Sequence, residues 1–385
     1  MSSTLTPEEA RHFLVGHAGL RAVVHPTGAE GIRALLEARR CIQLDPLEPL
    51  GTNADLVALA RLDGVKRGDI YRDLHPGHAF EHFAKERCIL PASMFPAYRD
   101  QAVETPWWRS TARMKRVPPE ALEAVHAEVK ARGPLTPQDL SDHGAVDAIN
   151  WHGWQSTSKM GTMALEVLWL RCRVVVCGRR GRNRVFDVPE RVLPQVAAAK
   201  PTGNFFREGL LNRVEAMGLM PRTDGPWWSM LNAVRKTPLA DELIDEGLIE
   251  QVQIPGKRTL YLAPAGFRDR TYPDDDGRMR IIGPLDPLIW CRPLIKQAFG
   301  FEYVWEVYKP EDKRRWGWYV CPLLHEGRLV GRFEGHIEGG EVVVDTLWKE
   351  DGVPFDEAAF KRALERHGAA CTPRAPASDL PTQRP

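Results

Sequence analysis

Hydrophobic and polar residues over 116–195 follow first a helical period and then a strand-like one. The predicted elements are helices over 120–132, from Thr136 and over about 156–169, then strands over 174–176 and 185–188. Thr136 is expected to cap the second helix, with Pro137 in its first turn. Three helices followed by strand, turn and strand is the order of a winged helix.

A second stretch, 196–278, repeats this pattern more loosely. Helices are expected over 207–217 and 239–246, and strands over 248–254 and 259–262 with a turn at 255–258 between them. Such a repeat predicts tandem modules of one kind. Residues 1–115 are interpreted as a third, divergent copy, although no wing is recognisable in them.

From Arg280 onward the pattern changes to short strands separated by turns, expected over 303–308, 317–322, 329–333 and 341–347. The fold class is therefore predicted to be α+β, with tandem winged-helix (helix-turn-helix) modules and a C-terminal small antiparallel β-barrel. The predicted domains are 1–115, 116–195, 196–278, the barrel over 279–352, and a C-terminal helix with a loose tail over 353–385.

Composition restricts the broad class of protein and leaves the predicted fold unchanged. Of the 385 residues, 43% are hydrophobic and 27% are charged, which excludes a wholly disordered or fibrous chain. No basic stretch leads into an apolar run and no eighteen apolar residues stand together, so a cytoplasmic protein is expected. Seven scattered cysteines fit a reducing compartment better than a disulfide framework.

Two basic segments are candidates for contact with nucleic acid. The first is the predicted wing, whose arginines include Arg179, Arg180, Arg182 and Arg184. A wing beside a recognition helix is a place for phosphate contacts, although a solvated hairpin would have the same composition. The second is the turn over 309–316, which carries Lys313, Arg314 and Arg315 and is equally compatible with an ordinary surface loop.

Gln43, Leu44, Asp45 and Pro46 form the candidate for chemistry. In an extended segment Gln43 and Asp45 project to one side, where an amide and a carboxylate can hold and polarise one water. The alternative is that Asp45 only caps a turn before Pro46. A metal site at His75, His78 and His82 is not expected, because the intervening Pro-Gly pair breaks any helix that would align the rings.

These segments together resemble the AlkZ and AlkX (YcaQ-like) family of winged-helix DNA glycosylases over roughly residues 10–350. The resemblance is carried by 41–46, Phe80-Glu81 with 89–91, 151–154 through Ser158-Lys159, 186–191, above all 285–292, and then 299–303 to 322–324 with Gly331-Arg332. It implies three tandem winged helices in a C-shape closed by a β-barrel. It also implies excision of N7-alkylguanine, including the unhooking of interstrand crosslinks.

The resemblance also implies roles for particular residues. The family's catalytic pair is Gln-x-Gln or Gln-x-Asp, and Gln43 with Asp45 matches the second form. Ser158 and Lys159 join the wing arginines as expected DNA contacts. Two departures concern substrate scope, because Ala54 and Lys85 stand where relatives often have histidine.

The chemistry follows from the charge of the lesion. An N7-alkylguanine is cationic and leaves without a general acid, whereas the oxocarbenium-like sugar needs a nearby anion and an oriented water. We therefore expect a monofunctional glycosylase that needs no metal or other cofactor and whose partner is double-stranded DNA carrying alkylated bases. The alternatives are a non-enzymatic winged-helix transcriptional regulator and a structural DNA-binding protein that uses the barrel for protein partners.

Overall fold

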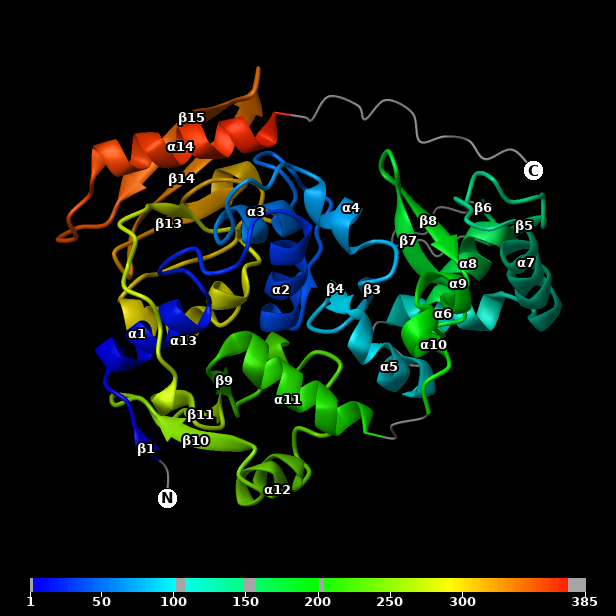
Figure 1. Cartoon of the computed structure of the whole chain (residues 1–385), viewed down its shortest axis with the longest axis horizontal. Helices are drawn as coiled ribbons and strands as arrows, with labels where there is room; N and C mark the ends of the chain where they lie inside the picture. The colour runs from blue at the N-terminus through cyan, green and yellow to red at the C-terminus, as the bar shows by residue number, and fades with distance from the viewer. Residues whose placement is uncertain (1–2, 102–107, 148–156, 201–203, 373–385) are drawn as a thin grey trace. The chain divides into compact units, whose positions relative to one another are not determined.

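The computed structural model describes residues 3–101, 108–147, 157–200 and 204–372 (Figure 1). The contacts between these residues divide the chain into two compact units. Unit 1 comprises Met1–Leu5, Leu36–Leu44 and Tyr71–Arg270. Unit 2 comprises Thr6–Leu35, Asp45–Ile70 and Thr271–Pro385. Helices α2 (Ala29–Arg39) and α4 (Asp69–Leu74) cross from one unit to the other.

Unit 1 contains a three-stranded antiparallel sheet in the order β2-β4-β3, formed by β2 (Ile42–Gln43), β3 (Ala79–Phe83) and β4 (Arg87–Pro91). Ile42 and Ile89 pair at its centre and are both fully buried. After this sheet come α5 (Phe95–Gln101) and α6 (Trp108–Arg116). The sheet holds the first candidate catalytic residue, Gln43, in a strand fixed on one side by backbone pairing.

The stretch 116–195 has most of the predicted elements. They are α7 (Pro119–Arg132), the two-stranded β5 (Ala145–Asp147) and β6 (Thr157–Lys159), α8 (Met160–Leu170), the hairpin β7 (Val175–Arg180) and β8 (Asn183–Asp187), and the short α9 (Pro189–Val192) and α10 (Pro194–Ala197). The buried faces of α7 and α8 pack with the hairpin in one apolar core. Gly181 turns the hairpin with a positive φ of 60°, a conformation that favours glycine.

Two predictions in this stretch were wrong. Thr136 does not begin a helix: its backbone N–H and its hydroxyl both donate to Asp139 Oδ2, at 2.8 Å each, and close a single turn. The helix expected over about 156–169 begins only at Met160, because 157–159 pair with β5 as a strand. Residue 156, like 151–154, lies outside the described residues.

The helices and strands predicted over 196–278 are present in the structure. They are α11 (Phe205–Met217), β9 (Met220–Pro221), α12 (Leu239–Asp245), β10 (Ile249–Gln253) and β11 (Leu260–Pro264). The sheet has the order β1-β10-β11-β9, and β1 (Ser3–Thr4) joins β10 in parallel. Each predicted element is present to within a few residues.

Unit 2 is built on a four-stranded antiparallel sheet in the order β12-β13-β14-β15. Its elements are α1 (Pro7–His17), α3 (Asn53–Leu59), β12 (Arg280–Ile281), α13 (Arg292–Phe299), β13 (Val320–His325), β14 (Arg328–Glu338), β15 (Glu341–Lys349) and α14 (Glu357–Cys371). Helix α14 lies along the sheet (Figure 1), and its Phe360 packs against Phe333 with ring centroids 5.8 Å apart.

The predicted C-terminal barrel is corrected in two respects. Among the described strands β12 and β15 do not pair, so the sheet is open rather than closed. The stretch 303–308 is not a strand, because side chains replace ladder bonds there: the Tyr303 hydroxyl donates to Val320 O at 2.7 Å, and Glu306 Oε2 accepts from the backbone N–H of Trp316 at 2.7 Å. The mixed α+β class itself is confirmed. The tail beyond residue 372 lies outside the described residues.

Candidate functional site

Gln43 is a buried side chain on β2, with 6% of its surface exposed. Lys85, in the turn between β3 and β4 and also 6% exposed, donates from Nζ to Gln43 Oε1 at 3.1 Å. An ammonium group can only donate, so the contact fixes which end of the amide faces the lysine. Lys85 is one of the two departures from the resemblance, and it lies directly on the candidate catalytic amide.

Asp45 is half-buried, and its Oδ1 accepts from the backbone N–H of Leu47 at 2.9 Å. This is the turn-capping bond that the sequence offered as an alternative to catalysis. A carboxylate that holds a turn through one oxygen is also held in one orientation, so the bond is compatible with either role. The division between the two units falls between Leu44 and Asp45.

The second departure, Ala54, is fully buried near the start of α3. Thr52 caps that helix, and Asp55 Oδ2 in turn accepts from the Thr52 backbone N–H at 3.0 Å. Burial is the first influence on Asp55 and raises its pKa. Ala54 therefore belongs to a packed and capped helix start.

The wing arginines are engaged by carboxylates and rings to different degrees. Arg179 is 20% exposed, forms an ion pair with the buried Glu81 and stacks over Tyr71 at 4.9 Å. Arg184 pairs with Glu166 and lies over Trp169 at 5.1 Å. Arg180 is 64% exposed and pairs with Asp139 at 2.9 Å, and Arg182 is exposed at the turn. The exposed surface of this hairpin therefore carries Arg180 and Arg182.

Ser158 and Lys159 lie together on β6, immediately before α8. Ser158 is half-buried and lines a hollow of unit 1, whereas Lys159 is exposed at the N-cap of the helix. Of this pair, Ser158 is the one that the structure brings together with Arg184.

The loop over 309–316 is organised around the buried Glu306. This carboxylate accepts from Lys309 Nζ at 2.7 Å and from the backbone N–H of Arg315 at 2.9 Å. The Arg315 guanidinium stacks on the Trp316 ring at 4.4 Å. Lys313 ends the short 3-10 helix Glu311–Lys313 and is exposed. The turn is thus a shaped element that presents cations beside an aromatic ring.

A buried polar cluster at Glu81 was missed by sequence reasoning. Glu81 lies on β3, its Oε1 faces His75 Nε2 at 3.9 Å, and both side chains are fully buried. Burial lowers the pKa of His75 to about 4, so the ring is neutral at neutral pH. The Phe80-Glu81 motif carries the family resemblance, but no sequence pattern links Glu81 to His75 or to Arg179.

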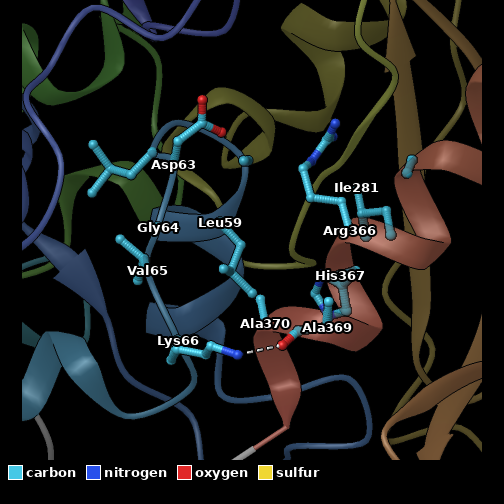
Figure 2. Close-up of a pocket in the computed structure, with 13 residues that line it drawn as sticks. Leu59, Asp63, Gly64, Val65, Lys66, Ile281, Arg366, His367, Ala369 and Ala370 are labelled. Carbon is cyan, nitrogen blue, oxygen red and sulfur yellow. Dashed lines mark hydrogen bonds between the residues drawn. The ribbon is translucent and has the colours of Figure 1, made fainter. Parts of the chain in front are cut away.

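Figure 2 shows a hollow of about 200 Å³ in unit 2, between the segment 59–66 and α14. Its cations are already engaged: Lys66 Nζ donates to Ala369 O at 2.8 Å, and Arg366 Nη2 donates to Met279 O at 2.9 Å. Its carboxylate, Asp63, accepts from Arg278 at 2.7 Å. These bonds satisfy the polar lining from within the unit.

No group of three or more His, Cys, Asp or Glu side chains in the described residues is arranged to hold a metal ion. None of the helices described is long and apolar enough to cross a membrane.

Comparison with known proteins agrees with this architecture. A DNA glycosylase from Streptomyces sahachiroi, AlkZ, has a similar solved structure, with a TM-score of 0.57 at 16% sequence identity. The match covers 95% of this chain and 97% of that one. The family model for AlkZ-like DNA glycosylases matches residues 36–370, which is most of the chain. The chain therefore belongs to the AlkZ-like DNA glycosylase family.

Proposed function

We propose that this DNA glycosylase hydrolyses the N-glycosidic bond of N7-alkylguanine in double-stranded DNA, with Gln43 and Asp45 as its catalytic pair. Family membership supports glycosylase chemistry, and the single observation that supports the pair is the Lys85 contact that holds the buried Gln43 amide. Asp45 orients or deprotonates the water and stabilises the cationic sugar, while Gln43 positions that water. The reaction is monofunctional and needs no lysine adduct.

The proposal extends to the modules that carry the DNA. We interpret 1–115, 116–195 and 196–278 as winged-helix modules. The 279–352 segment is a domain with an open antiparallel sheet in place of the predicted barrel, and 353–385 is a C-terminal helix and tail. The hairpin β7–β8 with helices α7 and α8 supports the second module. Ser158, Lys159, Arg180, Arg182 and Arg184 are then its DNA contacts, with Lys313, Arg314 and Arg315 contributed by the loop. Arg179 is withheld from DNA by its ion pair with Glu81.

The decisive experiment is single-turnover excision from a duplex that contains N7-methylguanine. Asp45→Asn should lower the rate at least a hundredfold while DNA affinity stays within a few fold, because removal of a transition-state charge costs roughly 3–4 kcal/mol of barrier. Gln43→Ala should cost less. Equal rates for Asp45→Asn and the parent protein would disprove the catalytic assignment.

The turn bond at Asp45 supplies a matched control. Asparagine retains an oxygen that can accept from the Leu47 N–H, whereas Asp45→Ala loses both that bond and the charge. If only the turn matters, Asp45→Asn is active and Asp45→Ala is not. If the charge matters, both are inactive and only the alanine variant is also destabilised.

The same assay separates the alternative functions. A transcriptional regulator would bind duplexes and release no base from any of them. A structural DNA-binding protein would bind damaged and undamaged duplexes equally, again without excision.

Crosslink unhooking is tested by shortening the 311–315 turn, which should slow unhooking more than excision of N7-methylguanine.

A further inference from the structure

Unit 1 contains a hollow of about 280 Å³ bounded by β4, β6, β8, α6 and α8. Its polar lining residues are Arg87, Arg113, Arg184, Ser158, Thr162 and Glu166. Its apolar wall is formed by Phe83, Met163, Trp169 and Leu170. Three guanidinium groups thus face one carboxylate, and the lining is positively charged.

That single carboxylate leaves one donor of Arg184 without a bond. Glu166 pairs with Arg184 through Nη2, and the other nitrogen, Nη1, is buried with no hydrogen-bond partner among the described residues. Arg87 has no ion pair within the part of the chain that the structure describes. Burial lowers the pKa of Arg87, and the charge of Arg184 lowers it further. A buried donor without an acceptor is costly unless a ligand or water supplies one.

The guanidinium of Arg184 is held in place before any ligand arrives. Its Cζ lies 5.1 Å from the ring centroids of both Trp169 and Phe186. A planar fork with fixed donors matches the geometry of phosphate oxygens. The hydroxyls of Ser158 and Thr162, both half-buried, add donors of the kind that contact DNA phosphates.

We propose that this hollow binds one backbone phosphate of the DNA substrate, with Arg87, Arg113 and Arg184 as its cationic ligands. The inference rests on the proposed function and adds to it a phosphate next to the target nucleotide. The backbone N–H of Leu44 donates to Arg87 O at 2.8 Å. Arg87 is therefore bonded to the residue between Gln43 and Asp45, and the phosphate ligand sits on the strand beside the catalytic motif.

The test is a salt titration of binding to an undamaged duplex, followed by fluorescence anisotropy, for the parent, Arg87→Gln and Arg113→Gln. Each variant should lower the slope of log affinity against log salt by about one and weaken binding roughly three- to tenfold. Arg207→Gln is the matched control, because Arg207 pairs with Glu246 on the same unit and lies outside the hollow. It should leave the slope unchanged.

Charge and fold are separated by further measurements. Arg113→Lys should recover most of the slope, and thermal midpoints report whether each variant is folded. Slopes equal to that of the parent in both glutamine variants would overturn the proposal.

Further outcomes show whether the hollow takes free phosphate or a DNA phosphate. They also separate a failure of the phosphate site from a failure of the proposed function. If inorganic phosphate raises the thermal midpoint of the parent and not of Arg113→Gln, while duplex binding is unchanged, the hollow takes free phosphate and the DNA assignment is wrong. If the parent excises N7-methylguanine and the variants bind DNA as it does, only the phosphate site fails. A parent that neither binds nor excises removes the proposed function together with this site.

Discussion

Each unit contains a buried arginine–carboxylate pair, and the two pairs differ in how completely they are hydrogen-bonded. In unit 2, Arg61 and Asp286 are 1% and 0% exposed and form two bonds, of 2.7 and 2.9 Å. Arg61 also donates to Ala18 O and Val57 O, and Asp286 accepts from the Leu288 N–H. Both side chains of this pair therefore have several hydrogen-bond partners inside unit 2.

In unit 1, Glu81 pairs with Arg179 but leaves atoms unbonded. Glu81 Oε2 and both ring nitrogens of His75 are buried with no hydrogen-bond partner among the described residues. The carboxylate of each pair lies in a motif that carries the family resemblance, so the motif alone does not separate a structural pair from an incomplete one. Hydrogen-bond completeness does, because incomplete buried networks are places where a ligand or water completes the bonding.

The largest expected effect is on unit 2. Asp286→Ala leaves the Arg61 charge buried and unpaired, which costs about 3–5 kcal/mol in folding free energy. Denaturant unfolding of the full chain measures it. Replacing Arg61 as well should not restore stability, because the Ala18 and Val57 carbonyls lose their donors. Full recovery in the double variant would show that only the charge pair matters.

The second effect is on acid stability and comes from unit 1. His75 and His82 are buried, and burial lowers the pKa of each to about 4. As pH falls below about 6.5, the two histidines take up protons in the unfolded state before they do so in the folded state. Each buried neutral ring therefore lowers the free energy of unfolding between pH 6.5 and 4, by roughly 3 kcal/mol at most. Unfolding midpoints measured across this range should fall steeply.

Two variants separate the histidines. His75→Leu should flatten part of the pH dependence with little loss at pH 7.5, because His75 has no hydrogen bond to lose within the described structure. His82→Leu also removes the 3.1 Å contact between Nε2 and Leu170 O and should cost stability at every pH. An unchanged acid limb in His75→Leu would contradict a buried neutral ring.

The third effect tests the incomplete pair directly. Arg179→Gln leaves Glu81 buried without its cation and should cost about 1–3 kcal/mol. Arg179→Gln combined with Glu81→Gln should recover most of this loss. Among the described residues Arg179 is the only charged ion-pair partner of Glu81, because the His75 ring at 3.9 Å is neutral. A double-mutant cycle on unfolding free energies measures the coupling. If the double variant does not recover stability, the Arg179–Glu81 pair behaves as we expect of Arg61 and Asp286, whose double replacement also leaves the loss in place.

The comparison also shows where sequence reasoning stops. Helical spacing located α7 and α11, and the β-branched run with Gly181 located the β7–β8 hairpin, because these elements are set by local periodicity. Thr136 was misread because a capped helix and a capped turn share the same first residues. The strand expected over 303–308 did not form, and the side chains of Tyr303 and Glu306 there bond to backbone groups of Val320 and Trp316.

The candidate site likewise has features that the sequence predicts and features that it does not. The Gln43 and Asp45 motif could be read from the sequence, whereas the Lys85 contact spans 42 positions and the Arg179 pair with Glu81 spans 98. Charge runs predicted a basic wing but not which arginines stay exposed, since packing against Glu81, Tyr71 and Trp169 decides that. Long-range partners follow from tertiary packing, which no local pattern encodes.

The smallest expected effect on stability is at the exposed end of the same hairpin, where Arg180 and Arg182 contrast with the half-buried Arg179. Arg180 and Asp139 are 64% and 31% exposed, so this pair contributes about 0–1 kcal/mol. Arg180→Ala with Arg182→Ala should leave the unfolding midpoint nearly unchanged but lower the salt slope of duplex binding by about one per lost phosphate contact. Damage preference should survive, because phosphate contacts carry no base information. Arg179→Ala should do the reverse, with a clear loss of stability and little change in slope. An equal change in slope for both variants would show that burial at Glu81 does not withhold Arg179 from DNA.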